Sequence, residues 1–148
     1  MKHYYIPHFI LLFISFVSAC QTSTTGNTVV KPEKLKLNEV IKAFKSANLP
    51  LGQLEFFTAK SDPKQLLGKP NQYTEKAIWQ TTEKMVHSVE GFADEADVQT
   101  RKTAIEAAAQ SGAQPAEYVY AHKNILLRIH HEMIPETAAK FEYALKEL

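Results

Sequence analysis

YVYAHKNILLRI, residues 118–129, sets the architecture expected for this chain of 148 residues. β-branched, aromatic and aliphatic residues on both sides of Ala121–Asn124 are typical of two strands joined by a turn. Asn124 tolerates the left-handed backbone conformation that tight turns need. We therefore expect an antiparallel hairpin with strands over Tyr118–Tyr120 and Ile125–Ile129.

Hydrophobic spacing predicts the other elements. Segments rich in β-forming residues between turn signals are expected to be strands, and segments with apolar residues three or four apart are expected to be helices. The expected strands are Leu54–Thr58, Lys76–Thr81 and Met85–Phe92. The expected helices are Glu39–Asn48 after the N-cap Asn38, Glu95–Gln110 after the N-cap Asp94, and a last helix that begins at Pro135.

The resulting order is α-β-β-β-α-β-β-α, in which hairpins rather than parallel crossovers dominate. This order predicts an α+β fold with a mainly antiparallel sheet of about four to five strands. We expect the three helices to pack on one face of that sheet.

The N-terminal segment has the pattern of a bacterial lipoprotein signal. Lys2 supplies a positive charge, Phe9–Val17 is an apolar run, and Ser18-Ala19-Cys20 follows it. The apolar run is shorter than the about 20 residues that span a bilayer. We expect cleavage between Ala19 and Cys20 and a lipid anchor on the Cys20 sulfur. The alternatives are an uncleaved membrane anchor and an ordinary signal peptide with a chance cysteine.

Domain organisation follows from this signal. We expect residues 1–19 to be removed, residues 20–34 to form a lipid-anchored flexible tether, and residues 35–148 to form a single globular domain. Cys20 is the only cysteine, so a disulfide within the chain is excluded. Removal of Lys2 with the leader leaves basic and acidic residues equal in number. Such a balance gives no reason to expect nucleic acid as a partner.

A turn-rich segment over residues 62–74, DPKQLLGKPNQYT, marks a family. It resembles the D-P-x-x-L-L-G-(R/K)-P-x-Q-Y stretch of a family of uncharacterised small lipoproteins of Gram-positive bacteria. The resemblance extends over about Val40–Leu148 and includes Phe92–Asp97 and Asn124–Arg128. It supports a lipid anchor and implies no particular activity. Similar proteins often have a Gly-Asn turn where this chain has Ala121–Asn124.

Two groups of residues are candidates for chemistry. Asp62, Lys69, Gln72 and Tyr73 offer charge, amide and phenol groups on a constrained loop, which suits a ligand or partner; the alternative is a purely structural loop. The second group is His130-His131-Glu132 with His122, since imidazole and carboxylate bind divalent metals. Pro135 stands where an HExxH motif needs its second histidine, so that motif is absent. His122 and His130 are left as weak metal candidates if they face each other across the hairpin.

The sequence therefore favours a non-enzymatic binding or interaction module, held at the outer face of the cell membrane by lipid on Cys20. Its partner would be an envelope protein or a small ligand, and we expect no cofactor. The alternative is a surface metal-binding protein or enzyme that uses His122, His130, His131 and the Asp62–Tyr73 loop.

Overall fold

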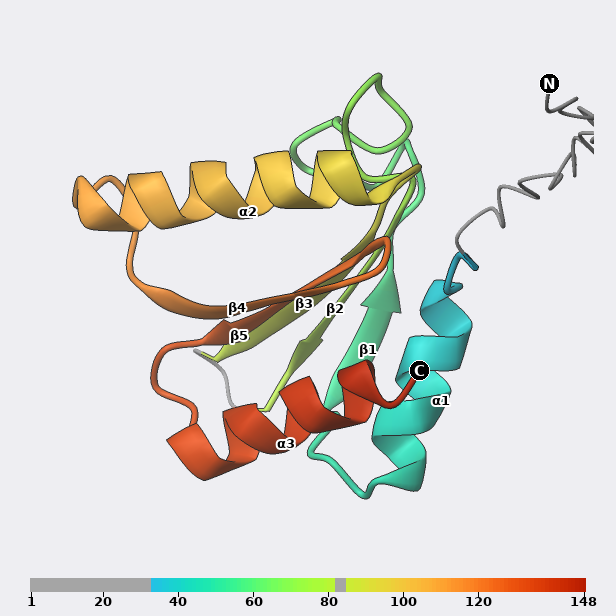
Figure 1. The fold of residues 1–148 in the computed structure, drawn as a ribbon, viewed down its shortest axis with the longest axis vertical. Helices are drawn as coiled ribbons and strands as arrows, with labels where there is room; N and C mark the ends of the chain where they lie inside the picture. The colour runs from blue at the N-terminus through green and yellow to red at the C-terminus, as the bar shows by residue number, and fades with distance from the viewer. Residues whose placement is uncertain (1–32, 82–84) are drawn as a thin grey trace, which may run out of the picture. The chain divides into compact units, whose positions relative to one another are not determined.

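In the part of the chain that the structure describes, five strands form one antiparallel sheet in the order β1-β2-β3-β5-β4, and three helices pack against it (Figure 1). The computed structural model describes residues 33–81 and 85–148. The expected signal peptide, Cys20, most of the expected tether and residues 82–84, between two of the expected strands, lie outside the described residues. The elements are α1 (Leu37–Ser46), β1 (Gln53–Phe56), β2 (Glu75–Gln80), β3 (Val86–Gly91), α2 (Glu95–Gln110), β4 (Glu117–His122), β5 (Ile125–His130) and α3 (Pro135–Lys146).

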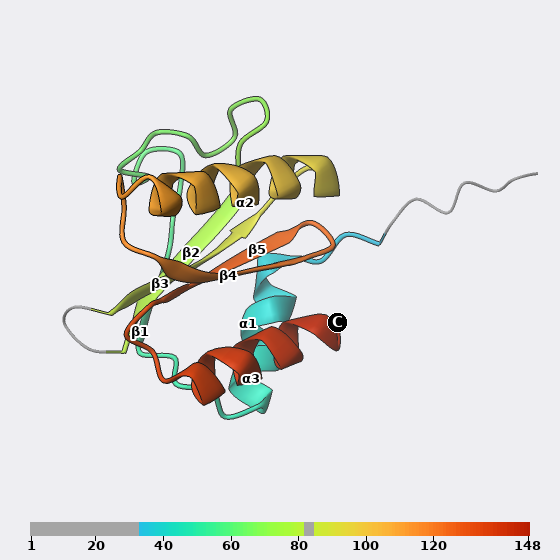
Figure 2. The ribbon, with the colours of Figure 1, turned by 60° about the vertical axis from the view of Figure 1, so that its left-hand side comes forward.

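The predicted α+β class and element order are confirmed, but the helices do not share one face of the sheet. Helices α1 and α3 cover one face, whereas α2 lies on the other (Figures 1 and 2). Strand β5 shows the physical reason, because Ile125 and Leu127 join the core on the first face while Leu126 joins the core on the second. A continuous apolar run of this kind is typical of a strand buried on both sides.

The larger core lies between the sheet and the pair α1 and α3. Phe44 and Phe141 contact edge to face with ring centroids 5.1 Å apart, and Trp79 lies 5.6 Å from Phe141. All three side chains are fully buried. Aromatic rings in this geometry contribute about 0.5–1.5 kcal/mol beyond the area that they bury, so these rings fix α1 and α3 on the sheet.

The smaller core lies under α2 and includes loop residues. Val98 and Ile105 from α2 pack with Phe92, Leu126 and the ring of Tyr73. Leu66 and Leu67, from the loop that precedes β2, pack against the same cluster. The loop and α2 therefore form a shared layer over this face.

The β4–β5 turn differs from the expected one. Only Lys123 and Asn124 separate the strands, and Lys123 rather than Asn124 has positive φ, at 50°. The Asn124 side chain instead clamps the segment before α1: its Oδ1 accepts from the Leu35 amide at 2.8 Å, and its Nδ2 donates to the Leu35 carbonyl at 3.0 Å. The same Nδ2 also donates to the Phe92 carbonyl at 3.3 Å.

Helix α1 begins at Leu37, two residues before the predicted start, with Lys36 rather than Asn38 as its N-cap. Two carboxylates account for this start. Glu39 accepts from the Lys36 amide at 2.9 Å, and Glu75 from β2 accepts from the Leu37 amide at 3.0 Å. These acceptors satisfy amides that the first turn of a helix leaves without partners, so a cap at Asn38 is not needed.

Candidate ligand-binding hollow

A fully buried carboxylate lies at the centre of the face that α2 covers. Glu90 of β3 has no exposed surface, and three cations surround it. Its Oε1 is 3.2 Å from the Lys76 Nζ and 3.7 Å from an Arg128 Nη1, and its Oε2 is 3.2 Å from the Arg101 Nε. A buried carboxylate without a cationic partner would destabilise the folded state by several kcal/mol. The fold therefore depends on these three cations.

Strand register explains how these charges meet. Lys76 on β2 is the cross-strand partner of Glu90, and Arg128 on β5 is the partner of Ser88, two residues before Glu90. Side chains two residues apart on a strand share a face. Arg101 reaches the same carboxylate from α2.

A second carboxylate, that of Glu117, forms a bidentate salt bridge with Arg128. The Arg128 Nε and Nη2 donate to the two Glu117 oxygens at 2.7 and 2.9 Å. Burial alone would lower the pKa of Arg128, but the hydrogen bonds to Glu117 and its charge outweigh burial and raise it. The guanidinium therefore stays charged.

Positive charge exceeds negative charge in this cluster. Three cations contact two carboxylates, Glu90 and Glu117. Desolvation lowers the pKa of the Lys64 ammonium, and the charges of Arg101, Arg128 and Lys76 lower it further, while the charge of Glu90 acts in the opposite direction.

The loop that precedes β2 is held by Asp62. This carboxylate is 1% exposed and accepts from the Tyr73 hydroxyl at 2.8 Å and from the backbone amides of Leu66, Leu67 and Lys64 at 2.7, 3.0 and 3.2 Å. Burial alone would raise the pKa of Asp62, but these hydrogen bonds lower it to about 2. The carboxylate of Asp62 and the hydroxyl of Tyr73 are thus used in hydrogen bonds to each other and to the loop backbone.

The predicted loop site is therefore not assembled around a common ligand position. Tyr73 is fully buried, Gln72 is half-buried, and Lys69 is exposed. The Tyr73 ring faces the charge cluster instead, with the Lys76 Nζ 4.7 Å from its centroid. Its pKa is raised by burial and by the hydrogen bond to Asp62.

Strands β3 and β5 separate beyond Ser88. Their pairing covers Ser88–Gly91 and Ile125–Arg128, although each strand continues for two more residues. The His87 imidazole then takes the place of a ladder partner, because its Nδ1 accepts from the His130 amide at 3.1 Å. Its Nε2 lies 3.0 Å from the Thr81 Oγ1.

His87 is neutral at physiological pH. Burial, followed by the charge of His130, lowers its pKa to about 4. Since Nδ1 accepts a hydrogen bond, the ring proton of the neutral form is on Nε2 and points to Thr81.

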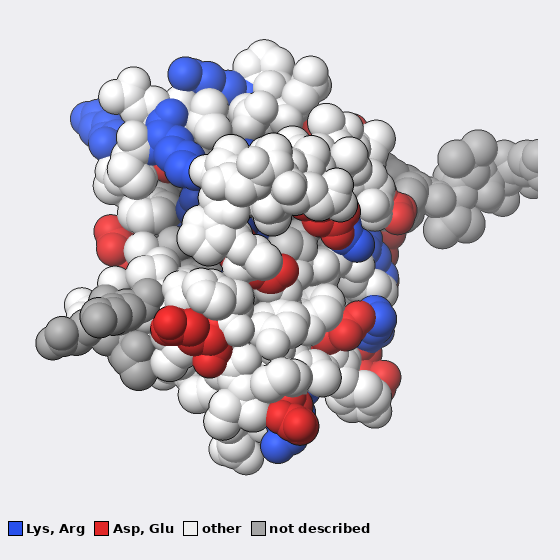
Figure 3. Space-filling model, turned by 90° about the vertical axis from the view of Figure 1, so that its left-hand side faces the viewer, with Lys and Arg blue, Asp and Glu red and all other residues white. Residues whose placement is uncertain are grey.

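A hollow of about 350 Å³ opens on the α2 side of the sheet at this end. Ile78, Ser88 and Arg128 form a cross-strand row in it. Figure 3 views the molecule from the left-hand side of Figure 1 and shows basic side chains most crowded in its upper part; α2 and the loop lie at the top of the molecule in Figures 1 and 2. The complete lining is Lys76, Ile78, Val86, His87, Ser88, Glu117, Arg128 and His130.

Of the candidate residues chosen from the sequence, His130 lines this hollow, but as a metal candidate, and the charged residues around it were not predicted. The sequence does contain one indication of the charge cluster. Apolar strand segments are interrupted by the charged residues Lys76, Glu90 and Arg128. Ionisable residues are rarely buried unless they are paired. Their partners, however, lie on neighbouring strands 14 and 38 positions away in the sequence and cannot be matched from spacing alone.

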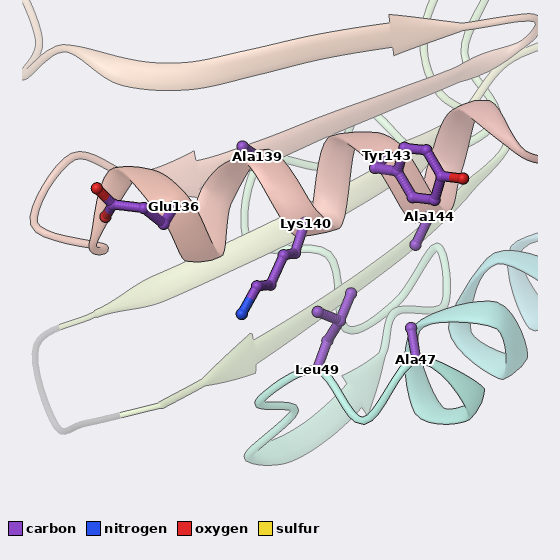
Figure 4. A pocket seen from close by; sticks show the side chains of 7 residues that line it. All are labelled: Ala47, Leu49, Glu136, Ala139, Lys140, Tyr143 and Ala144. Atoms are coloured by element: carbon purple, nitrogen blue, oxygen red, sulfur yellow. The ribbon is translucent and has the colours of Figure 1, made fainter.

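A second concavity, of about 310 Å³, lies between α3 and the segment after α1 (Figure 4). Ala144 and Leu49 line it from opposite sides, and Lys140 extends into the gap between α3 and that segment. Tyr143 at its rim is 67% exposed. Its walls are mainly apolar, and the charges described above lie on the other face of the sheet.

His122 and His130 do not face each other, so the condition for a metal site between them is not met. His122 pairs with Ile125 and His130 with Glu117, so they lie at opposite ends of the hairpin. His131 follows the end of β5, and its ring stacks on His130 with centroids 4.4 Å apart. Within residues 33–81 and 85–148, no three His, Cys, Asp or Glu side chains are placed to hold a metal ion.

No protein-family model, curated protein or solved structure matches the chain. In the part of the chain that the structure describes, every helix is too short or too polar to cross a bilayer.

Substitution of Glu90 tests the buried charge cluster. Glu90→Gln removes the anion between three cations, and we expect it to lower the free energy of unfolding by about 3–5 kcal/mol. Urea unfolding followed by tryptophan fluorescence measures the loss. Glu106→Gln is the matched control, because Glu106 is exposed and pairs with Lys102 on the surface of α2; it should cost no more than about 0.5 kcal/mol. Equal losses in the two variants would contradict the assigned role of Glu90.

Stability should also depend on pH through His87. The unfolded chain binds a proton at this histidine near pH 6.5, whereas the folded chain binds it only near pH 4. The stabilisation is therefore complete above pH 6.5 and is lost as the pH falls to 4, by up to about 3 kcal/mol. Urea unfolding at several pH values measures this slope.

His87→Leu should remove most of the slope between pH 6.5 and pH 4 while lowering stability at pH 7. The remainder comes from His122, whose pKa burial also lowers, and near pH 4 from Asp62, whose hydrogen bonds lower its pKa to about 2. His131→Leu is the control, because His131 is exposed, and it should keep the wild-type slope. An unchanged slope in His87→Leu would refute the assignment.

Proposed function

We propose that this chain is a lipid-anchored protein of the outer face of the cell membrane, whose domain is a non-enzymatic binding or interaction module. The hollow around Ser88 is the observation that supports binding. It combines an excess of positive charge with an open, partly apolar floor, which is typical of sites that fix a ligand by a few polar groups.

The contacts around Ser88 support a binding role rather than catalysis. His87, the nearest histidine along the chain, engages both ring nitrogens, with Thr81 and the His130 amide. Its pKa of about 4 makes it a weak base at neutral pH. Activation of a serine hydroxyl needs an adjacent base that can accept its proton.

The membrane location is inferred from the lipoprotein pattern at Ser18-Ala19-Cys20. Two or more acyl chains hold a protein stably on a bilayer, whereas one does not. A diacylglyceryl group on Cys20 meets this condition. A tethered domain also meets partners at the surface at high effective concentration, so modest affinity in the hollow suffices.

Metabolic labelling tests the anchor. In bacteria that express the full chain and take up an alkyne fatty acid, we expect the wild-type protein to be labelled and Cys20→Ala to lose the label entirely. Thr24→Ala, four residues further along, should retain it. A wild-type protein that stays unlabelled would refute the anchor.

Crosslinking in the same cells tests the binding role. A photo-reactive amino acid at Val86, which lines the hollow and is 42% exposed, should yield a discrete adduct, detected as a mass increase of the purified chain. The matched control places it at Ser46, which is exposed on α1, and should give no such adduct. Identical patterns from both positions would count against binding in the hollow.

A further inference from the structure

We infer that the hollow binds the carboxylate of a small molecule with a short aliphatic body. This inference rests on the proposed binding role and specifies its ligand. It follows from the charge of the cluster, the donors that remain free, and the apolar part of the floor.

The charge balance favours a monoanion. Lys76, Arg101 and Arg128 contact Glu90 and Glu117, which leaves one positive charge uncompensated by contact. A carboxylate supplies one negative charge. A phosphate dianion would add a second charge beside two protein carboxylates and would meet repulsion from them.

Free donors line the same wall. The two hydrogen bonds to Glu117 use Nε and Nη2 of Arg128. Among the residues that the structure describes, the one polar contact of its Nη1 is with Glu90 at 3.7 Å, which is too long for a hydrogen bond. Ser88, which is 8% exposed, is the cross-strand partner of Arg128 and lines the hollow with it. A guanidinium edge and a hydroxyl together match the two oxygens of a carboxylate.

The apolar part of the floor is the reason for inferring that the ligand has an aliphatic body. Ile78 is the cross-strand partner of Ser88 and is half-buried, and Val86 is 42% exposed. Both line the hollow next to the donors. Covering exposed apolar area gives about 25 cal/mol per Å², so a chain of a few methylene groups adds to the affinity that the carboxylate provides.

Titration of the full chain in a nonionic detergent tests this inference. Hexanoate is the probe, and its binding is followed by the amide NMR signals of the ¹⁵N-labelled protein. We expect saturable shifts at Ile78, Ser88 and Arg128. Hexylamine, which has the same body and the opposite charge, should produce none, and inorganic phosphate should bind at least about tenfold more weakly than hexanoate.

Two Ser88 variants localise the binding. Ser88→Leu fills the floor and should weaken hexanoate at least about tenfold, whereas Ser88→Ala removes only the hydroxyl and should weaken it about two- to fivefold. Ser46→Leu is the control and should bind as the wild type does. Dispersed amide spectra verify that each variant is folded.

Three results would overturn the inference: no saturable hexanoate shift, tighter binding of phosphate than of hexanoate, or wild-type affinity in folded Ser88→Leu. None of these results would alter the labelling of Cys20 or the crosslinks from Val86 in cells. A failed carboxylate assignment is therefore distinguishable from a failed binding module.

Discussion

The carboxylate of Glu90 is the constraint on which one half of this molecule depends. Because it is fully buried, it stabilises the fold only while cations from β2, α2 and β5 converge on it. That requirement orients α2 across β5, and it brings Lys76 under the Tyr73 ring, whose hydroxyl binds Asp62. The loop, the helix and the sheet are thus connected through a single anion, and the same convergence gives the neighbouring hollow its positive character.

Much of the fold could be predicted because its signals are local. The 3.6-residue spacing and the cap at Asp94 placed α2 at Glu95–Gln110, as observed, and Pro135 marked the start of α3. The face that α2 covers could not be read in the same way. Only Val98 and Ile105 of its sixteen residues are buried, so the helix carries a weak apolar stripe, and the rest of that core comes from loop residues whose spacing has no regular period.

The candidate site was less predictable, for a related reason. Asp62 and Tyr73 were chosen for their chemistry, yet that chemistry is used within the loop, where a carboxylate satisfies three amides and a phenol. Ser88, by contrast, has no distinguishing neighbour in the sequence. Its position becomes informative only when pairing brings Ile78 and Arg128 beside it and when the imidazole of His87 allows β3 and β5 to separate.

The clamp between Asn124 and Leu35 has a mechanical consequence. Tension applied to the chain ahead of α1 would reach Leu35 first, and the Asn124 amide holds both the N–H and the C=O of that residue. The load would pass directly into the β4–β5 turn, close to Phe92 at the end of β3, rather than into the first turn of α1. A domain pulled from this end would therefore yield by breaking the Asn124 clamp before any helix unwinds.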